Sequence, residues 1–129
     1  MDKFFNDSIF LDRNILLRAI YPPSKKPDFW VNGRLSSAAF KDKRGLSVTC
    51  TNGKNKEESI VFMKDNFQGR IFSVTLFDCK KVNAYLVFEP SYNNPYHSEI
   101  HSSKRVVELN DEQALLLARS AKLENFGTK

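Results

Sequence analysis

Residues 70–77, RIFSVTLF, restrict the folds open to this chain more than any other part of the sequence. β-Branched and aromatic residues occupy both sets of alternating positions, a pattern typical of a strand with both faces covered. We expect this strand to be the spine of a sheet. Any fold for the chain must therefore place packed side chains on both sides of it.

Further strands follow from the spacing of apolar residues. Alternation predicts strands at residues 15–20, 46–50 and 84–89. The segment 97–102 alternates polar and apolar residues and is predicted to be an edge strand with Ile100 turned inward. These strands are too irregularly spaced for a repeating parallel α/β unit.

Helical spacing of apolar residues predicts two main helices, at residues 55–67 and 111–124. Capping boxes that begin at Asn55 and Asn110 open them, and Asp78 is a candidate N-cap for a short turn between two strands. The sequence therefore predicts an α+β fold, a small mixed sheet of about four or five strands with two main helices.

The length of 129 residues suits one domain, and we expect residues 1–129 to form it, with 1–13 and 126–129 loosely ordered. A content of 41% hydrophobic and 27% charged residues is that of a soluble globular protein. No apolar run approaches the roughly eighteen residues that cross a bilayer, and aspartates interrupt the apolar start of the chain. We predict a cytoplasmic protein without a membrane partner.

The two cysteines, Cys50 and Cys79, are too few for a disulfide scaffold, and their separation fits no zinc-ligand spacing. Each lies in an apolar stretch, which predicts buried free thiols. The sequence contains no P-loop, no G-x-G-x-x-G and no G-x-S-x-G motif. We therefore expect no metal and no cofactor.

The polar segment from Gly33 to Val48 is the first candidate site. Its guanidinium, ammonium and hydroxyl groups are donors suited to a phosphate or carboxylate. The alternative is a hydrogen-bonded surface turn in which a serine caps a short helix. The candidate binding residues in this segment are Arg34, Ser36, Ser37, Lys41, Lys43 and Arg44.

The second candidate segment follows a loop rich in Pro and Asn. His97, Glu99 and His101 lie on one side of the predicted strand, so the carboxylate can orient an imidazole for acid–base chemistry. The alternative is a pair of solvent-exposed histidines. A zinc site would need a third ligand, and no motif nominates one.

The formal charge of +5 permits binding to a polyanion. Lysines crowd the first half of the chain, where Phe29, Trp30 and Phe40 lie between them. Positive charge follows a phosphate backbone and aromatic rings stack on bases, so this mixture suits single-stranded nucleic acid. The alternative is that the aromatic residues belong to the core and the lysines to an ordinary surface.

Four segments, LLRAIYP, GRLSSAAFKDKRGLSV, GRIFSVTLFDC and NPYHSEI, together resemble a family of short uncharacterised bacterial proteins. The resemblance extends over most of residues 16–100 and implies an accessory partner of a larger bacterial system, with no activity to carry over. The positions that carry it are Gly33, Ser36, Ser37, Ala39, Phe40, Leu46, Ser47, Val48, Gly69, Val74, Thr75, Cys79, Pro95 and His97.

A second resemblance concerns only the order of three residue types. Arg18, then Ser36 and Ser37, then Glu99 follow the order Arg, Ser, Glu of one class of ADP-ribosyltransferases. We therefore carry two hypotheses. The first is a small accessory or binding domain acting through a partner protein or a polyanionic ligand. The second is a small enzyme acting on a nucleotide or nucleic acid, ADP-ribosyltransferase-like or otherwise.

Overall fold

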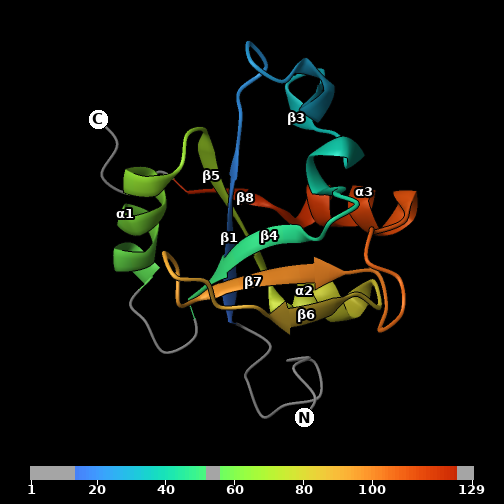
Figure 1. Cartoon of the computed structure of the whole chain (residues 1–129). Helices are drawn as coiled ribbons and strands as arrows, with labels where there is room; N and C mark the ends of the chain where they lie inside the picture. Colours follow the sequence, from blue (N-terminus) through green and yellow to red (C-terminus); the bar gives the residue numbers. More distant parts are fainter. Residues whose placement is uncertain (1–13, 52–55, 125–129) are drawn as a thin grey trace.

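The computed structural model describes residues 14–51 and 56–124, which build one antiparallel sheet with helices on both faces (Figure 1). β1 (Ile15–Ile20) pairs along its whole length with β5 (Arg70–Thr75). On its other side it pairs with β4 (Leu46–Cys50), but only through Leu16 and Leu17. β1 is therefore the strand that joins the two halves of the sheet.

The remaining strands extend the sheet on both sides. β7 (His97–His101) lies beside β4, and β6 (Tyr85–Phe88) lies beyond it at the edge. At the other end, β8 (Lys122–Leu123) pairs with β5. The six-stranded order is β6-β7-β4-β1-β5-β8. One expectation is thereby corrected: β7 is an inner strand because β6 pairs with it. β5 is an inner strand with core residues on both faces, as expected, and β4 and β1 form the middle of the sheet.

The two faces of the sheet are covered unequally. α2 (Leu76–Lys81), α3 (Asp111–Ser120) and the 3₁₀ turn η3 (Ser37–Phe40) cover one face and enclose the larger core. α1 (Lys56–Asn66) covers the other face, where its core residues meet only those of β1 and β5. The part of that face formed by β4 and β7 therefore presents polar side chains without such a core above them.

A short hairpin precedes η3. β2 (Trp30–Val31) and β3 (Arg34–Leu35) are joined by Asn32 and Gly33, whose φ angles are 52° and 78°. Positive φ at both central residues is the geometry of a tight two-residue hairpin loop. Asn-Gly is the dipeptide most typical of such a loop. The 3₁₀ turn η2 (Pro27–Phe29) leads into this hairpin, and Phe29 and Trp30 pack against the core.

The mixed α+β class is confirmed, while several boundaries differ. The strand predicted at 70–77 ends at Thr75, because Thr75 is the N-cap of α2 and Asp78 closes the capping box from the third helical position. The capping box at Asn110 and Gln113 is confirmed. α3 ends earlier than predicted, and the chain after it forms β8. The expected four or five strands agree roughly with the six of the main sheet, and β8 was not predicted because a two-residue strand is too short to show a period.

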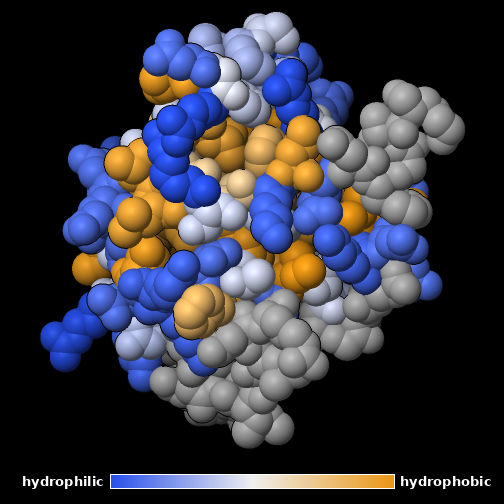
Figure 2. Space-filling view, turned by 180° about the vertical axis from the view of Figure 1, so that it is seen from behind, coloured by the Kyte–Doolittle hydropathy of each residue, from blue (hydrophilic) through white to orange (hydrophobic). Residues whose placement is uncertain are grey.

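Cys50 and Cys79 are buried free thiols, as predicted. No helix among the described residues is long and apolar enough to cross a membrane. The expectations for residues 1–13 and 126–129, and for the cap at Asn55, lie outside the described residues. Figure 2 shows the side opposite to that of Figure 1, where apolar surface is bordered by hydrophilic side chains.

Candidate functional site

The structure places the predicted site residues in two regions on opposite faces of the sheet. His97 and Glu99 pair with Thr49 and Ser47 of β4 on the face that α1 partly covers. Arg34 lies at the end of the β2–β3 hairpin, in a cavity on the α3 side. Arg34 is therefore separated from His97 and Glu99, whereas the end of the first predicted segment, at Gly45 and Ser47, contacts the second.

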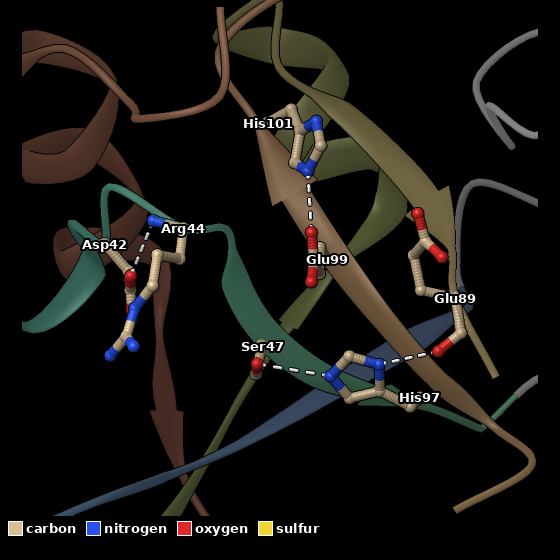
Figure 3. A network of polar contacts seen from close by, with 7 residues as sticks. All are labelled: Asp42, Arg44, Ser47, Glu89, His97, Glu99 and His101. Atoms are coloured by element: carbon tan, nitrogen blue, oxygen red, sulfur yellow. Dashed lines mark hydrogen bonds and ion pairs between the residues drawn. The ribbon is translucent and has the colours of Figure 1, made fainter. Parts of the chain in front are cut away.

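His97 is held by two hydrogen bonds (Figure 3). Its Nδ1 lies 2.7 Å from the backbone carbonyl of Glu89, and its Nε2 lies 3.2 Å from Oγ of Ser47. A carbonyl oxygen only accepts, so Nδ1 must carry a hydrogen. In the neutral ring Nε2 is then an acceptor, and the Ser47 hydroxyl donates to it. These contacts fix the neutral tautomer with its hydrogen on Nδ1, in which Nε2 can take a proton from Ser47.

Buried Asn94 positions the start of β7 and so positions His97. Its side-chain oxygen accepts from the backbone N–H of Tyr96 at 3.0 Å, and its Nδ2 donates to Thr49 Oγ1 at 2.9 Å. Its own carbonyl accepts from the backbone N–H of His97 at 3.1 Å. The loop before β7 is therefore tied to β4 by a buried amide, which limits the freedom of the histidine that follows.

Glu99 pairs with His101, the second histidine of β7. Glu99 Oε1 lies 2.8 Å from His101 Nε2, and both side chains are largely shielded from solvent. Gly45 packs directly against this carboxylate, since a Cβ at Gly45 would lie 2.5 Å from Cδ of Glu99. Figure 3 shows the pair further along the strand than His97, so the two histidines belong to separate contacts.

Arg18 follows the last residue of β1 that pairs with β4. Its Nε donates to the carbonyl of Ala39 and its Nη1 to the carbonyl of Ser47, both at 3.0 Å. Burial lowers the pKa of Arg18 to about 10, and nearby Asp42 opposes this shift. The guanidinium remains charged at neutral pH and replaces the ladder bonds that the separated strands cannot make.

A cavity of about 160 Å³ opens beside this arginine on the α1 side of the sheet. Ser47, His97 and Arg18 contribute its polar groups. The rest of its wall is formed by Ala19, Val48, Thr49, Met63 and Phe67. A serine hydroxyl and an imidazole acceptor thus meet at an opening that Arg18 also borders, with a mostly apolar lining.

The predicted basic segment takes up mostly structural contacts. Ser36 precedes η3 without capping it and donates instead to the carbonyl of Asp28 at 2.6 Å, which corrects its expected role as a cap. Ser37 is the first residue of η3. Lys41 pairs with Asp111 at 2.5 Å. Among the described residues of this segment, only three exposed basic side chains therefore keep an unpaired charge. They are Arg34, Lys43 and Arg44.

Arg34 has two neighbouring arginines that were not predicted as site residues. Arg34, Arg70 and Arg119 line a cavity of about 350 Å³ together with Trp30 and Phe72. Arg70 lies over the Trp30 ring at 5.0 Å, and Arg119 donates to the carbonyl of Leu35 at 2.8 Å. No Asp or Glu is among the described residues that line this cavity. The site is therefore both cationic and aromatic.

Three functional features were missed because they depend on distant parts of the chain. Ser47 occupies an ordinary outward position of a predicted strand, and only pairing with β7 brings it to His97. Arg70 and Arg119 lie 49 residues apart in number and meet only because β5 and α3 flank the hairpin. Among the described residues no group of three or more His, Cys, Asp or Glu side chains could hold a metal ion.

No family model matches this chain, and neither a curated protein nor a solved structure matches it. The resemblance to a family of short bacterial proteins therefore stays a prediction.

Proposed function

We propose that this chain is a small binding domain for a phosphate-bearing polyanion, held at the cavity lined by Arg34, Arg70 and Arg119. The observation that carries the proposal is the convergence of three exposed arginines on one opening without an acidic side chain in its lining. Guanidinium groups match phosphate geometry through paired N–H donors. A phosphate placed there would meet a positive field from three directions.

The aromatic part of the cavity favours a nucleotide unit over a simple anion. Trp30 and Phe72 lie with their ring centroids 6.0 Å apart. Trp30 is anchored, since its Nε1 donates to the carbonyl of Tyr21 at 2.9 Å. Phe72 is buried, so Trp30 is the ring available to stack on a base. An aromatic ring beside arginines provides the combination of stacking and backbone contact by which single-stranded nucleic acids are bound. The volume of the cavity also falls within the range of ordinary ligand sites.

The basic loop at residues 41–44 offers fewer unpaired positive charges than its composition suggested. Lys41 is paired with Asp111, which leaves Lys43 and Arg44 as its exposed positive charges. Arg44 points away from the His97 and Glu99 contacts (Figure 3). We expect these two residues to add long-range attraction to a polyanion and little specific contact.

Trp30 is the only tryptophan in the sequence, so its fluorescence reports directly on this cavity. We expect a labelled single-stranded oligonucleotide to change that fluorescence, with an affinity that falls steeply as salt rises. Arg34→Gln and Arg70→Gln should each weaken binding about tenfold and reduce the salt slope by about 0.7. Arg105→Gln, an exposed arginine outside the cavity, is the matched control and should change neither.

The alternative ligand is a partner protein, because an accessory domain would meet the carboxylates of that protein's acidic surface. Polyglutamate in the same titration separates the two sources. Binding of polyglutamate but not of the oligonucleotide would replace the nucleic-acid proposal with an acidic protein partner. If neither ligand changes the Trp30 signal at low salt, the cavity is not a polyanion site.

A specific observation keeps the enzyme hypothesis as a second candidate. Arg18, Ser47 and Glu99 lie on the neighbouring strands β1, β4 and β7, in the chain order Arg, Ser, Glu. Ser47, rather than Ser36 or Ser37, is the serine that adjoins both other residues. If the chain transfers ADP-ribose, Glu99→Gln should abolish the transfer of label from a nicotinamide dinucleotide while the folded state persists.

A further inference from the structure

We propose that Ser47 and His97 form an acyl-transfer site that hydrolyses a small carboxylic ester in the 160 Å³ cavity on the α1 side of the sheet. This site lies on the opposite face of the sheet from the arginine cavity and shares no residue with it. The test of this proposal is therefore independent of the test of polyanion binding.

In the Ser47–His97 hydrogen bond the hydroxyl donates and the imidazole accepts, which is the direction that nucleophilic catalysis requires. The Glu89 carbonyl accepts the hydrogen of Nδ1 at 2.7 Å, which leaves Nε2 free to accept from Ser47. A base oriented by a third group beside a serine is the arrangement that activates a hydroxyl. Here the third group is a backbone carbonyl, so its position depends on the pairing of β6 with β7.

The serine is accessible and its base is restrained. Ser47 is exposed, whereas the Leu46 and Val48 side chains on either side of it are buried. Asn94 and the Glu89 carbonyl restrain His97 from two directions. Serine thus faces a ligand while the imidazole cannot easily rotate away, which is the preorganisation that a proton transfer needs.

The chemistry balances without any cofactor. Ser47 Oγ bonds to the acyl carbon while its proton passes to His97 Nε2, and that proton then leaves with the alcohol as the ester C–O bond breaks. Water next gives a proton to Nε2 and adds to the acyl carbon. The Ser47 Oγ bond to carbon breaks, and Oγ regains its proton from His97 as the carboxylic acid departs.

Arg18 supplies the electrostatic part of the site. Arg18 lines the same cavity, and its guanidinium is fixed by the carbonyls of Ala39 and Ser47. A fixed positive charge beside the acyl carbon stabilises the oxyanion that develops during both steps. The apolar side chains of Met63 and Phe67 suit a short hydrocarbon acyl group.

A fluorophosphonate probe tests the serine directly. We expect one phosphonyl group on the tryptic peptide 45–54, with fragmentation placing it on Ser47, and slow hydrolysis of p-nitrophenyl acetate by the same sample. Ser47→Ala should abolish the adduct, and His97→Gln should slow its formation by at least about 100-fold. Ser24→Ala, an exposed serine outside the cavity, is the control and should label like the unchanged chain.

Circular dichroism must show that His97→Gln remains folded, and Ser47→Ala is the second variant because an exposed serine is dispensable for folding. An unlabelled Ser47 in the unchanged chain overturns the proposal. Labelling of His97→Gln at the original rate overturns it equally, since the imidazole would then play no part. Binding of oligonucleotide at Trp30 has no bearing on either result.

Discussion

The Glu99 carboxylate lies against the backbone of Gly45, at a distance that leaves no space for a side chain there. Gly45 also has a φ of 118°, which L side chains rarely adopt. The same carboxylate accepts from His101 at 2.8 Å when that ring nitrogen carries a hydrogen. The loop before β4 therefore shapes the position of the Glu99–His101 contact on β7.

Gly45→Ala should displace the Glu99 carboxylate, because the flexible acid can move more easily than the backbone. We expect a loss of about 1–3 kcal/mol in the free energy of unfolding from backbone strain. The imidazole resonances of His101 should shift in NMR spectra while those of His97 stay in place. Unchanged His101 resonances would show that the carboxylate does not need the space at Gly45.

Gly69→Ala should be more damaging than Gly33→Ala, although both glycines have positive φ. A Cβ at Gly69 would lie 2.7 Å from the backbone oxygen of Ile20, whereas nothing lies within 4 Å of one at Gly33. We expect about 1–2 kcal/mol for Gly33→Ala from strain alone and about 3 kcal/mol or more for Gly69→Ala. Urea unfolding measures both, and equal losses would contradict the close approach to β1.

Arg18→Met should destabilise the fold, because it leaves the carbonyls of Ala39 and Ser47 without their donor. The expected loss is about 2–4 kcal/mol, since the side chain also holds β4 to β1 where their ladder ends. Arg105→Met, at an exposed site, should cost less than about 0.5 kcal/mol. Thermal unfolding compares the two, and similar midpoints would deny Arg18 a structural role.

The Lys41–Asp111 pair should make a small acid-dependent contribution to stability. The hydrogen bond and charge of Lys41 lower the pKa of Asp111 from its ordinary 3.8, so the folded state favours the carboxylate. This contribution is complete above pH 3.8 and disappears as the pH falls through the lower folded value. The stability difference between the unchanged chain and Asp111→Asn should shrink over that window and in high salt. A stability difference that depends on neither pH nor salt would show that the ion pair is not its cause.

The two thiols should resist modification in the folded protein. Burial raises the pKa of Cys79 well above its ordinary value, and Cys50 is buried as well. The reactive thiolate is therefore scarce at neutral pH. Ellman's reagent should titrate no buried thiol under native conditions and two per chain in denaturant. Rapid native reaction would show that the core opens locally.

The sequence by itself determined the elements with strong local signals. Alternating apolar residues placed β1, β4 and β6, and the Asn110 capping box placed the start of α3, because these signals arise from neighbouring residues. The Asn32–Gly33 turn is local in the same way. The mixed α+β class followed from the order of those elements.

Tertiary structure alone decided which of these elements meet. Pairing of β4 with β7 brings Ser47 to His97, and the hairpin, β5 and α3 together bring Arg34, Arg70 and Arg119 to one cavity. Strand order depends on long-range packing and hydrogen bonding, which leave no periodic trace in the sequence. Residue type could nominate Arg34 and His97, whereas their partners were set by contacts between segments that are remote along the chain.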